Sequence, residues 1–195
     1  AAEDGSIGSR RHVNLPGANL DVPSITEKDW EDIEHAAEAG VDYIALSFIR
    51  TAEEIVEVRA FLKKKKLNVG LVAKIETRQA VQNMDEIIKV SDVIMVARGD
   101  LGAEVSFEQI PVIQDRLVQC SRCEGKPVIV ATHMLESMVD NPMPTRAEVT
   151  DIAHAATIST DVTMLSGETA SGKHPFKALD AMARVLKATE EHLST

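Results

Sequence analysis

The stretch that decides the fold is Val69–Asp100, with the sequence VGLVAKIETRQAVQNMDEIIKVSDVIMVARGD. It begins and nearly ends with short apolar runs, Val69–Ile75 and Asp92–Ala97, whose length and composition are typical of strands buried on both faces. Between the runs, four apolar residues recur at helical spacing: Val81, Met84, Ile87 and Ile88. The stretch therefore predicts a strand, a helix and a second strand parallel to the first.

The same unit recurs along the chain. Five strands are predicted, at Val41–Phe48, Val69–Ile75, Asp92–Ala97, Pro127–Ala131 and Asp161–Ser166. Their starts lie 23 to 35 residues apart, which is the pitch of parallel βα units. Three of the intervening helical patterns open with a capping box, at Ser24–Glu27, Thr51–Glu54 and Thr145–Glu148, and Pro175 suits the first position of the last helix. The pattern predicts an α/β fold, either a doubly wound sheet or a partial TIM (β/α)8 barrel, because a full barrel has eight strands and typically about 250 residues.

Composition limits the classes of function. The chain has 195 residues, of which 44% are hydrophobic and 27% charged, as expected of a globular protein. No apolar stretch approaches the roughly 18 residues of a membrane span. The net charge of −10 argues against nucleic acid or an anionic membrane as the main partner. Residues 1–20 are predicted to be largely linker, and residues 21–195 form the α/β segment.

Polar residues stand at or just beyond the end of every predicted strand. They are Ser47, Arg50, Lys74, Glu76, Arg98, Gly99, Asp100, Thr132, His133, Ser166 and Glu168. Because parallel α/β folds place their sites at the carboxyl ends of the strands, we expect these residues to surround one mouth.

The types of residue at these strand ends indicate a metal site and an anionic substrate. Glu76 and Asp100 follow consecutive strands, and paired carboxylates suit Mg2+ or Mn2+. Lys74 lies two residues before Glu76, so both point to the same side of their strand, where a lysine would stabilise developing negative charge. Thr132 offers a hydroxyl to an anion, and Gly99 allows close approach of backbone or opens the turn at Asp100. Together they predict a small, metal-chelating, multiply anionic substrate such as a carboxylate or phosphate.

Two other motifs resemble functional sites but are better explained as parts of the structure. Gly167–Lys173 fits the pattern G-x-x-x-x-G-K, but His174 stands where a phosphate-binding loop needs Ser or Thr. Cys120 and Cys123 could form a redox pair or half of a zinc site, but they lie in a helical pattern without a second ligand pair. We therefore predict two packed or half-exposed thiols in a reducing compartment.

Several motifs, in order along the chain, resemble the pyruvate kinase family. They are Asn14–Gly17, Ser47–Arg50, Leu71–Val81, Ile94–Gly102, Pro127–Thr132, Met134–Met138, Pro144–Glu148 and Met164–Ala170. The resemblance covers nearly the whole chain. It implies strands four to eight of a TIM barrel, with residues 1–20 as the remnant of a junction to a lid domain. The activity it implies is phosphoryl transfer from phosphoenolpyruvate to ADP, giving pyruvate and ATP in glycolysis.

The resemblance also implies roles for metal and phosphoryl ligands. Lys74 stabilises the enolate and the transferring phosphoryl group. Glu76 and Asp100 bind the divalent metal, Mg2+ or Mn2+, that holds phosphoenolpyruvate. K+ is expected as a second cofactor, with its ligands in barrel strands that this sequence does not contain.

For the substrate carboxylate and the proton donor, the resemblance implies further residues. Backbone at Arg98, Gly99 and Asp100 binds the substrate with Thr132 nearby, and Thr132 and Ser166 belong to the region that protonates the enolate carbon. At position 133 this chain has His, where many members of the family have Gln; this departure bears on the details of proton transfer.

The last expectations concern the oligomeric state, the cellular compartment and alternative functions. The resemblance implies a homo-oligomer, usually a tetramer, in the cytoplasm or in a plastid. Two sheet edges, beside Val41–Phe48 and Asp161–Ser166, are expected to be open, and the isolated chain is expected to be inactive. The competing functions are a non-catalytic interaction or regulatory module, and another metal-dependent, enolate-forming barrel lyase or aldolase.

Overall fold

The computed structural model describes residues 23–195, and it contains one parallel sheet in the order β1-β2-β3-β4-β5. The strands are β1 (Tyr43–Leu46), β2 (Gly70–Ile75), β3 (Val93–Ala97), β4 (Val128–Ala131) and β5 (Val162–Met164). All four pairings are parallel. The predicted five-stranded parallel α/β fold is confirmed, with each strand one to four residues shorter than its predicted run. The linker at residues 1–20 and the motif Asn14–Gly17 lie outside the described residues.

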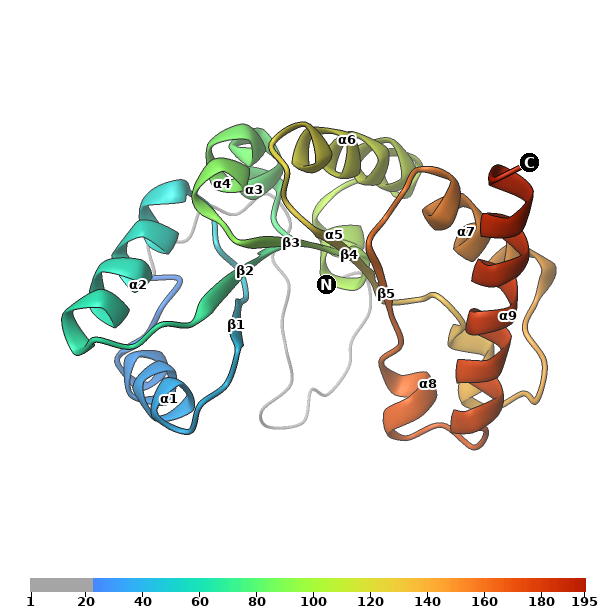
Figure 1. Cartoon of the computed structure of the whole chain (residues 1–195), viewed down its shortest axis with the longest axis horizontal. Coiled ribbons are helices and arrows are strands. Elements are labelled where there is room, and N and C mark those ends of the chain that lie inside the picture. Colours follow the sequence, from blue (N-terminus) through green and yellow to red (C-terminus); the bar gives the residue numbers. More distant parts are fainter. Residues whose placement is uncertain (1–22) are drawn as a thin grey trace, which may run out of the picture.

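Helices connect successive strands and cover one face of the sheet. They are α1 (Glu27–Glu38), α2 (Ala52–Lys65), α3 (Arg78–Gln82), α4 (Met84–Val90), α5 (Arg98–Glu104), α6 (Ile110–Cys123), α7 (Arg146–Thr157), α8 (Gly167–Ala170) and α9 (Pro175–Leu193), with short 3-10 turns η1 (Phe107–Gln109) and η2 (Glu136–Val139). In Figure 1 the sheet is curved, and α2, α4, α6 and α7 follow its convex side. This is the arrangement of a barrel segment rather than of a doubly wound sheet, which would carry helices on both faces.

The sheet divides the core into two clusters. The larger cluster packs strand residues such as Leu71, Ile75 and Ile94 against the helices. The smaller cluster lies on the opposite face and contains Val72, Val93, Met95 and Ala131, with Ile129 and Met164 packed beside them. Alternate residues of β2 and β3 therefore enter different clusters, as the two-residue period of a strand requires. The smaller cluster is the concave, barrel-interior face.

Burial on both faces holds only at the centre of the sheet. All five residues of β3 are buried, whereas on the edge strands Tyr43 is 58% exposed and Val162 is 47% exposed. Within residues 23–195, β1 and β5 each pair with a single strand. The predicted open edges are therefore confirmed for the described residues, and the apolar composition of the runs Val41–Phe48 and Asp161–Ser166, typical of strands buried on both faces, does not lead to such burial at the edges.

Two predictions about the helices are wrong, one about a cap and one about the number of helices. The first helix is capped by Thr26, whose box partner is Asp29, and not by Ser24. The Ser24 hydroxyl lies within hydrogen-bonding distance of Glu54 Oε1, at 2.6 Å, and of the carbonyl of Phe48, at 3.1 Å. The single helix predicted around Val81 to Ile88 is instead two, α3 and α4, which meet at Asn83. The predicted box at Thr145–Glu148 and the start at Pro175 are confirmed.

Candidate active site

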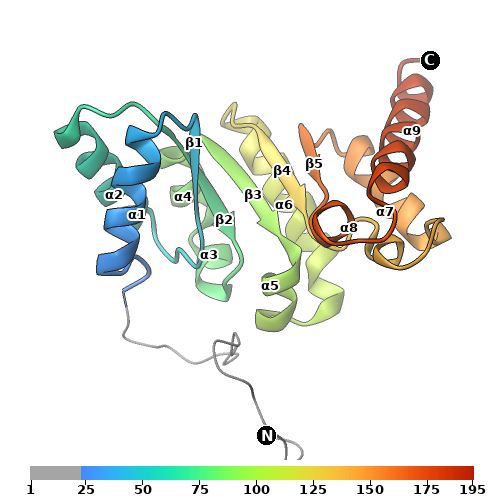
Figure 2. The same cartoon turned by 90° about the horizontal axis from the view of Figure 1, so that it is seen from below.

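The carboxyl ends of all five strands lie along one edge of the sheet. Since the strands are parallel and pair in chain order, the segments that follow them are neighbours in space. Figure 2 shows α5 and α8 at this edge, just beyond β3 and β5. The predicted residues Lys74, Glu76 and Thr132 therefore gather at the predicted mouth, together with Arg98–Asp100 and Ser166.

Lys74 and Glu76 form the most closely connected part of the mouth. Lys74 Nζ lies 3.0 Å from Glu76 Oε2 and donates to Ser47 Oγ at 2.6 Å. The Glu76 side chain is fully buried, and its Oε1 accepts a hydrogen bond from the backbone N–H of Phe48 at 2.6 Å. Its Oε2 is buried without a hydrogen-bond donor, so the lysine ammonium is its charge partner in this structure.

The end of β1 is shaped to meet this carboxylate. Phe48 has φ +54°, in the left-handed region, which costs a non-glycine residue roughly 1–2 kcal/mol. The charge-assisted hydrogen bond to Glu76 offsets part of that cost. The turn also follows Ser47, whose hydroxyl binds Lys74.

The carboxylates fit a hard divalent cation. Asp100 lies in the first turn of α5, directly after β3, and β3 is the neighbour of β2, which ends at Ile75, just before Glu76. Glu76 Oε2 is buried, and its one partner among the described residues is the Lys74 ammonium, so this oxygen has a lone pair left for a second cationic partner. No group of three or more His, Cys, Asp or Glu side chains within residues 23–195 is arranged as a metal site. Two carboxylates completed by water and substrate oxygens are, however, what Mg2+ commonly uses.

The side chain of Arg98 is turned into the protein. Its guanidinium donates to both carboxylate oxygens of Asp151, at 2.8 and 2.7 Å, and to the carbonyl of Thr132, at 3.1 and 2.6 Å. With these partners, the guanidinium serves the internal structure, and the backbone is the part of Arg98 suited to a ligand. The backbone role in substrate binding that the resemblance implies stays a prediction.

Thr132 is held by a strained turn. Thr132 and His133 have φ of +69° and +55°, and consecutive left-handed residues other than glycine cost roughly 1–3 kcal/mol each. Thr132 Oγ1 accepts from the N–H of Gly99 at 2.7 Å and donates to the carbonyl of Ala131 at 2.6 Å. A Cβ added at Gly99 would touch Thr132 no closer than 3.4 Å, so local packing does not demand glycine there.

Ser166 is tied to the β4 loop through Glu168, which is fully buried. The Glu168 carboxylate accepts from the N–H of Ser166 at 2.7 Å and from the N–H of Leu135 at 3.1 Å. From the sequence, Glu168 was expected among the polar residues around the mouth, and no role was assigned to it. Its position two residues beyond the predicted Asp161–Ser166 run was the available signal for this role.

The loop itself is explained by packing rather than by phosphate binding. A Cβ at Gly172 would lie 2.5 Å from the carbonyl oxygen of Glu168, so only glycine fits. Lys173 Nζ pairs with Asp140 at 2.8 Å on the surface, and this hydrogen bond raises the pKa of Lys173. The two thiols also fit their structural prediction: both are free, with Cys120 half-buried and Cys123 exposed.

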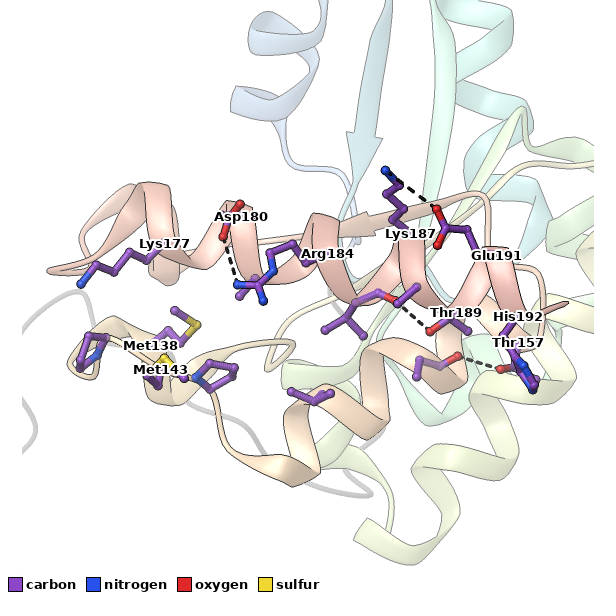
Figure 3. A pocket seen from close by; sticks show the side chains of 17 residues that line it. Met138, Met143, Thr157, Lys177, Asp180, Arg184, Lys187, Thr189, Glu191 and His192 are labelled. Atoms are coloured by element: carbon purple, nitrogen blue, oxygen red, sulfur yellow. Dashed lines mark hydrogen bonds and ion pairs between the residues drawn. The ribbon is translucent and has the colours of Figure 1, made fainter. Parts of the chain in front are cut away.

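An apolar groove lies away from the strand ends. The groove of about 1200 Å³ runs between η2, α7 and α9 and is lined by apolar residues such as Met138, Met143 and Val185 (Figure 3). The charged residues of α9 along it pair with one another, Arg184 with Asp180 and Lys187 with Glu191. It contains none of the strand-end residues. Among the described residues, no helix is both long and apolar enough to cross a membrane.

Comparison with known proteins gives one consistent family. Residues 1–179 match the model of the family "Pyruvate kinase, barrel domain". A pyruvate kinase of Dictyostelium discoideum is 50% identical over 184 residues, which are 94% of this chain and 36% of that protein. A pyruvate kinase of Thermotoga maritima is 47% identical over 97% of this chain and 41% of its own length, and pyruvate kinase 1 of Trypanosoma brucei brucei is 52% identical over 92% and 36%.

These similarities span most of this chain but only about two fifths of each relative. The matched region is the barrel domain, and the structure is an open barrel segment with the family's motifs at its strand ends. The chain therefore belongs to the pyruvate kinase family and carries part of its barrel domain.

Proposed function

We propose that this chain carries the metal- and substrate-binding half of a pyruvate kinase site, which transfers the phosphoryl group of phosphoenolpyruvate to ADP. The observation that carries the proposal is the placement of Lys74 Nζ between Ser47 Oγ and Glu76 Oε2 at the mouth of the sheet. We assign residues 21–195 to barrel strands four to eight and residues 1–20 to the junction with a lid domain.

In this proposal Lys74 supplies the positive charge that stabilises the enolate and the phosphoryl group in transit. The side chain is 22% exposed, so it is partly desolvated yet open to a ligand. Its two fixed partners hold the ammonium in place before the reaction, which is the condition for electrostatic stabilisation of a transition state.

Glu76 and Asp100 would hold the divalent cation, Mg2+ or Mn2+. When bound, such a cation neutralises charge on the phosphate and carboxylate oxygens of the substrate. The buried Oε2 of Glu76, whose one partner among the described residues is Lys74, supports this assignment. K+ is proposed as a second cofactor from the resemblance, and no residue of this chain is assigned to it.

The remaining residues would bind and protonate the organic part of the substrate. Backbone at Arg98, Gly99 and Asp100, with the Thr132 hydroxyl, would bind the carboxylate group. The Gly99 N–H donates to the Thr132 hydroxyl, and this contact holds the two groups next to each other at the mouth. Thr132 and Ser166 would belong to the region that delivers a proton to the enolate carbon.

The test is an assay of the complete polypeptide that contains this segment, with phosphoenolpyruvate, ADP, Mg2+ and K+. The proposal expects pyruvate and ATP in equal amounts, with loss of both when Mg2+ is chelated. Pyruvate and inorganic phosphate without ATP would mean that the phosphoryl group passes to water and would contradict transfer to ADP. Absence of pyruvate and ATP would favour one of the two competing functions, another metal-dependent, enolate-forming enzyme or an interaction or regulatory module.

Assembly and compartment remain parts of the proposal. We propose a homo-oligomer, as the resemblance implies. The similar proteins include plastidial pyruvate kinases 2 and 3 of Arabidopsis thaliana, at 46% identity each, so a plastid stands beside the cytoplasm as the proposed location.

A further inference from the structure

The buried guanidinium of Arg98 joins several elements around the candidate site. Its Nε and Nη2 both donate to the carbonyl oxygen of Thr132, at 3.1 and 2.6 Å. Its Nη1 donates to the two carboxylate oxygens of Asp151, at 2.8 and 2.7 Å. Arg98 begins α5 directly after β3, Thr132 directly follows β4, and Asp151 lies on α7. One side chain therefore links two strand ends to an outer helix.

The orientation of Thr132 depends on this guanidinium. Thr132 and His133 both have left-handed backbone conformations, which persist only where the surroundings hold them. Arg98 donates two hydrogen bonds to the carbonyl of Thr132. The Thr132 hydroxyl accepts a hydrogen bond from the N–H of Gly99 at 2.7 Å. If the guanidinium moves, the carbonyl loses its donors, and the contact between the hydroxyl and Gly99 changes with it.

Asp151 determines where the guanidinium lies. The other acceptors of Arg98 are uncharged: Gln114 Oε1 at 3.3 Å from Nη1, and the sulfur of Met134 at 2.8 Å from Nη2. Among the partners of Arg98 in residues 23–195, Asp151 is the one carboxylate. A buried charge that loses its counter-charge is strongly unfavourable, so without Asp151 the guanidinium would seek other partners or water.

We propose that Asp151 is a positioning residue for substrate binding, which acts through Arg98 to hold Thr132 and the Gly99 N–H in their binding geometry. The inference rests on the proposed function, in which Thr132 and Gly99 bind the carboxylate of phosphoenolpyruvate. Asp151 lies on the far side of the guanidinium from Thr132 and has no direct role in the reaction. Its side chain is 32% exposed, so its replacement by a polar residue of the same size is compatible with folding.

The first experiment compares two variants of the complete enzyme. Asp151→Asn keeps the size of the side chain but removes its charge. We expect the KM for phosphoenolpyruvate to rise roughly 10- to 100-fold, the usual effect of removing a residue that orients a ligand-binding group, while the KM for ADP stays unchanged. The control is Asp115→Asn, which removes the carboxylate that pairs with His154, another residue of α7. This pair of 2.8 Å does not include Arg98, and the control should leave both KM values unchanged.

The second experiment does not depend on activity. Hydrogen exchange at the Gly99 amide, resolved to single residues by mass spectrometry, reports the contact with Thr132 Oγ1. Exchange should accelerate in Asp151→Asn but not in Asp115→Asn. Unchanged exchange in Asp151→Asn would overturn the positioning role, even if the enzyme proved not to be a pyruvate kinase. Faster exchange with an unchanged KM for phosphoenolpyruvate would overturn its connection to substrate.

A second variant covers failure of Asp151→Asn to fold. Asp151→Glu keeps the charge but moves the carboxylate outward by one methylene group. We expect it to fold and to show changes in the same direction, smaller than those of the Asn variant. If Asp151→Asn does not fold, and Asp151→Glu shows wild-type exchange and a wild-type KM, the positioning role is contradicted. Asp151 would then be needed for stability alone.

Discussion

Lys74 and Glu76, separated by one residue at the end of β2, form an ion pair of 3.0 Å in which the glutamate is fully buried and the lysine is partly exposed. The pair is asymmetric in its other contacts. Lys74 has a second partner in Ser47, whereas the one partner of Glu76 Oε2 among the described residues is Lys74 itself. Burying a carboxylate is costly unless its oxygens are well satisfied. In the proposed function, the divalent cation is the second partner of this oxygen.

Replacing Glu76 should therefore weaken cation binding. Glu76→Gln keeps the acceptor for the Phe48 N–H but removes the negative charge. We expect weaker Mn2+ binding by the complete protein in the absence of substrate, as measured by calorimetry or electron paramagnetic resonance. Glu86→Gln, a change in the first turn of α4 away from the strand ends, serves as control. Equal Mn2+ affinity in Glu76→Gln and wild type would remove Glu76 from the metal site.

Ser47 should help to fix the ammonium of Lys74. Ser47→Ala removes the acceptor at 2.6 Å, and a hydrogen bond contributes about 1 kcal/mol, so kcat should fall roughly fivefold. Ser24→Ala is the matched control, because Ser24 also binds a charged side chain near the end of β1, that of Glu54. This control should lower the melting temperature without lowering kcat. A normal kcat in Ser47→Ala would mean that Lys74 does not need this contact.

The loop between β4 and α7 should loosen at acidic pH. Burial tends to raise the pKa of Glu148, but hydrogen bonds from Ser137 and Thr145 outweigh it and hold the pKa below the ordinary value of 4.5. A carboxylate with a lowered pKa in the folded state stabilises the protein above its unfolded-state pKa, and this stabilisation is lost as the pH falls through the folded value. The difference in the free energy of unfolding between wild type and Glu148→Gln should thus be largest near neutrality and shrink below about pH 4.5.

Denaturant unfolding at several pH values, between about pH 3 and pH 7, measures this difference. Glu190→Gln, on the last turns of α9, provides a comparison at a distance from the loop. A difference that is independent of pH would show that the hydrogen bonds of Glu148 do not depend on its charge.

The sheet and the mouth were predictable because their signals are local. Strand-length apolar runs at regular spacing predict parallel βα units, and the polar residues directly after them must then share one edge. The short helices α5 and α8 were missed, since Arg98–Glu104 and Gly167–Ala170 are too short to show an apolar stripe. The cap of α1 was placed wrongly because Ser24 and Thr26 are each followed three residues later by an acid, and the contact of Ser24 with Glu54 on another helix decides between them.

The supporting residues of the site were not predictable from local pattern. Asp151 is 53 positions from Arg98 and lies in the middle of an ordinary helical sequence. The contact between Asp151 and Arg98, and with it the proposed positioning role, becomes visible only in the folded chain. The Glu168 carboxylate likewise accepts a hydrogen bond from the N–H of Leu135, which is 33 residues away. Residues that touch a ligand are concentrated at strand ends, whereas residues that hold them are distributed over the fold.

The role of Lys74 gives the most direct test of the proposed chemistry. Lys74→Met removes the ammonium while keeping a long, flexible side chain. Removing one preorganised donor from a developing negative charge typically costs about 2.7–4 kcal/mol, so kcat of the complete enzyme should fall roughly 100- to 1,000-fold. The KM for phosphoenolpyruvate should change far less, because the lost interaction belongs chiefly to the transition state. Lys74→Arg should also fail, since a planar fork does not reproduce a compact ammonium between Ser47 and Glu76.

The competing explanation is that Lys74 serves only to neutralise the buried charge of Glu76. It predicts that Lys74→Met lowers the free energy of unfolding and leaves kcat near normal. Chemical denaturation of the same preparations separates the two effects, and the double variant Lys74→Met, Glu76→Gln sharpens the test. If the lysine were only a counter-charge, the double variant would regain stability and have the same kcat as Glu76→Gln alone. In the catalytic role the double variant regains stability, because no unpaired carboxylate remains, but its kcat stays at least as low as that of Lys74→Met.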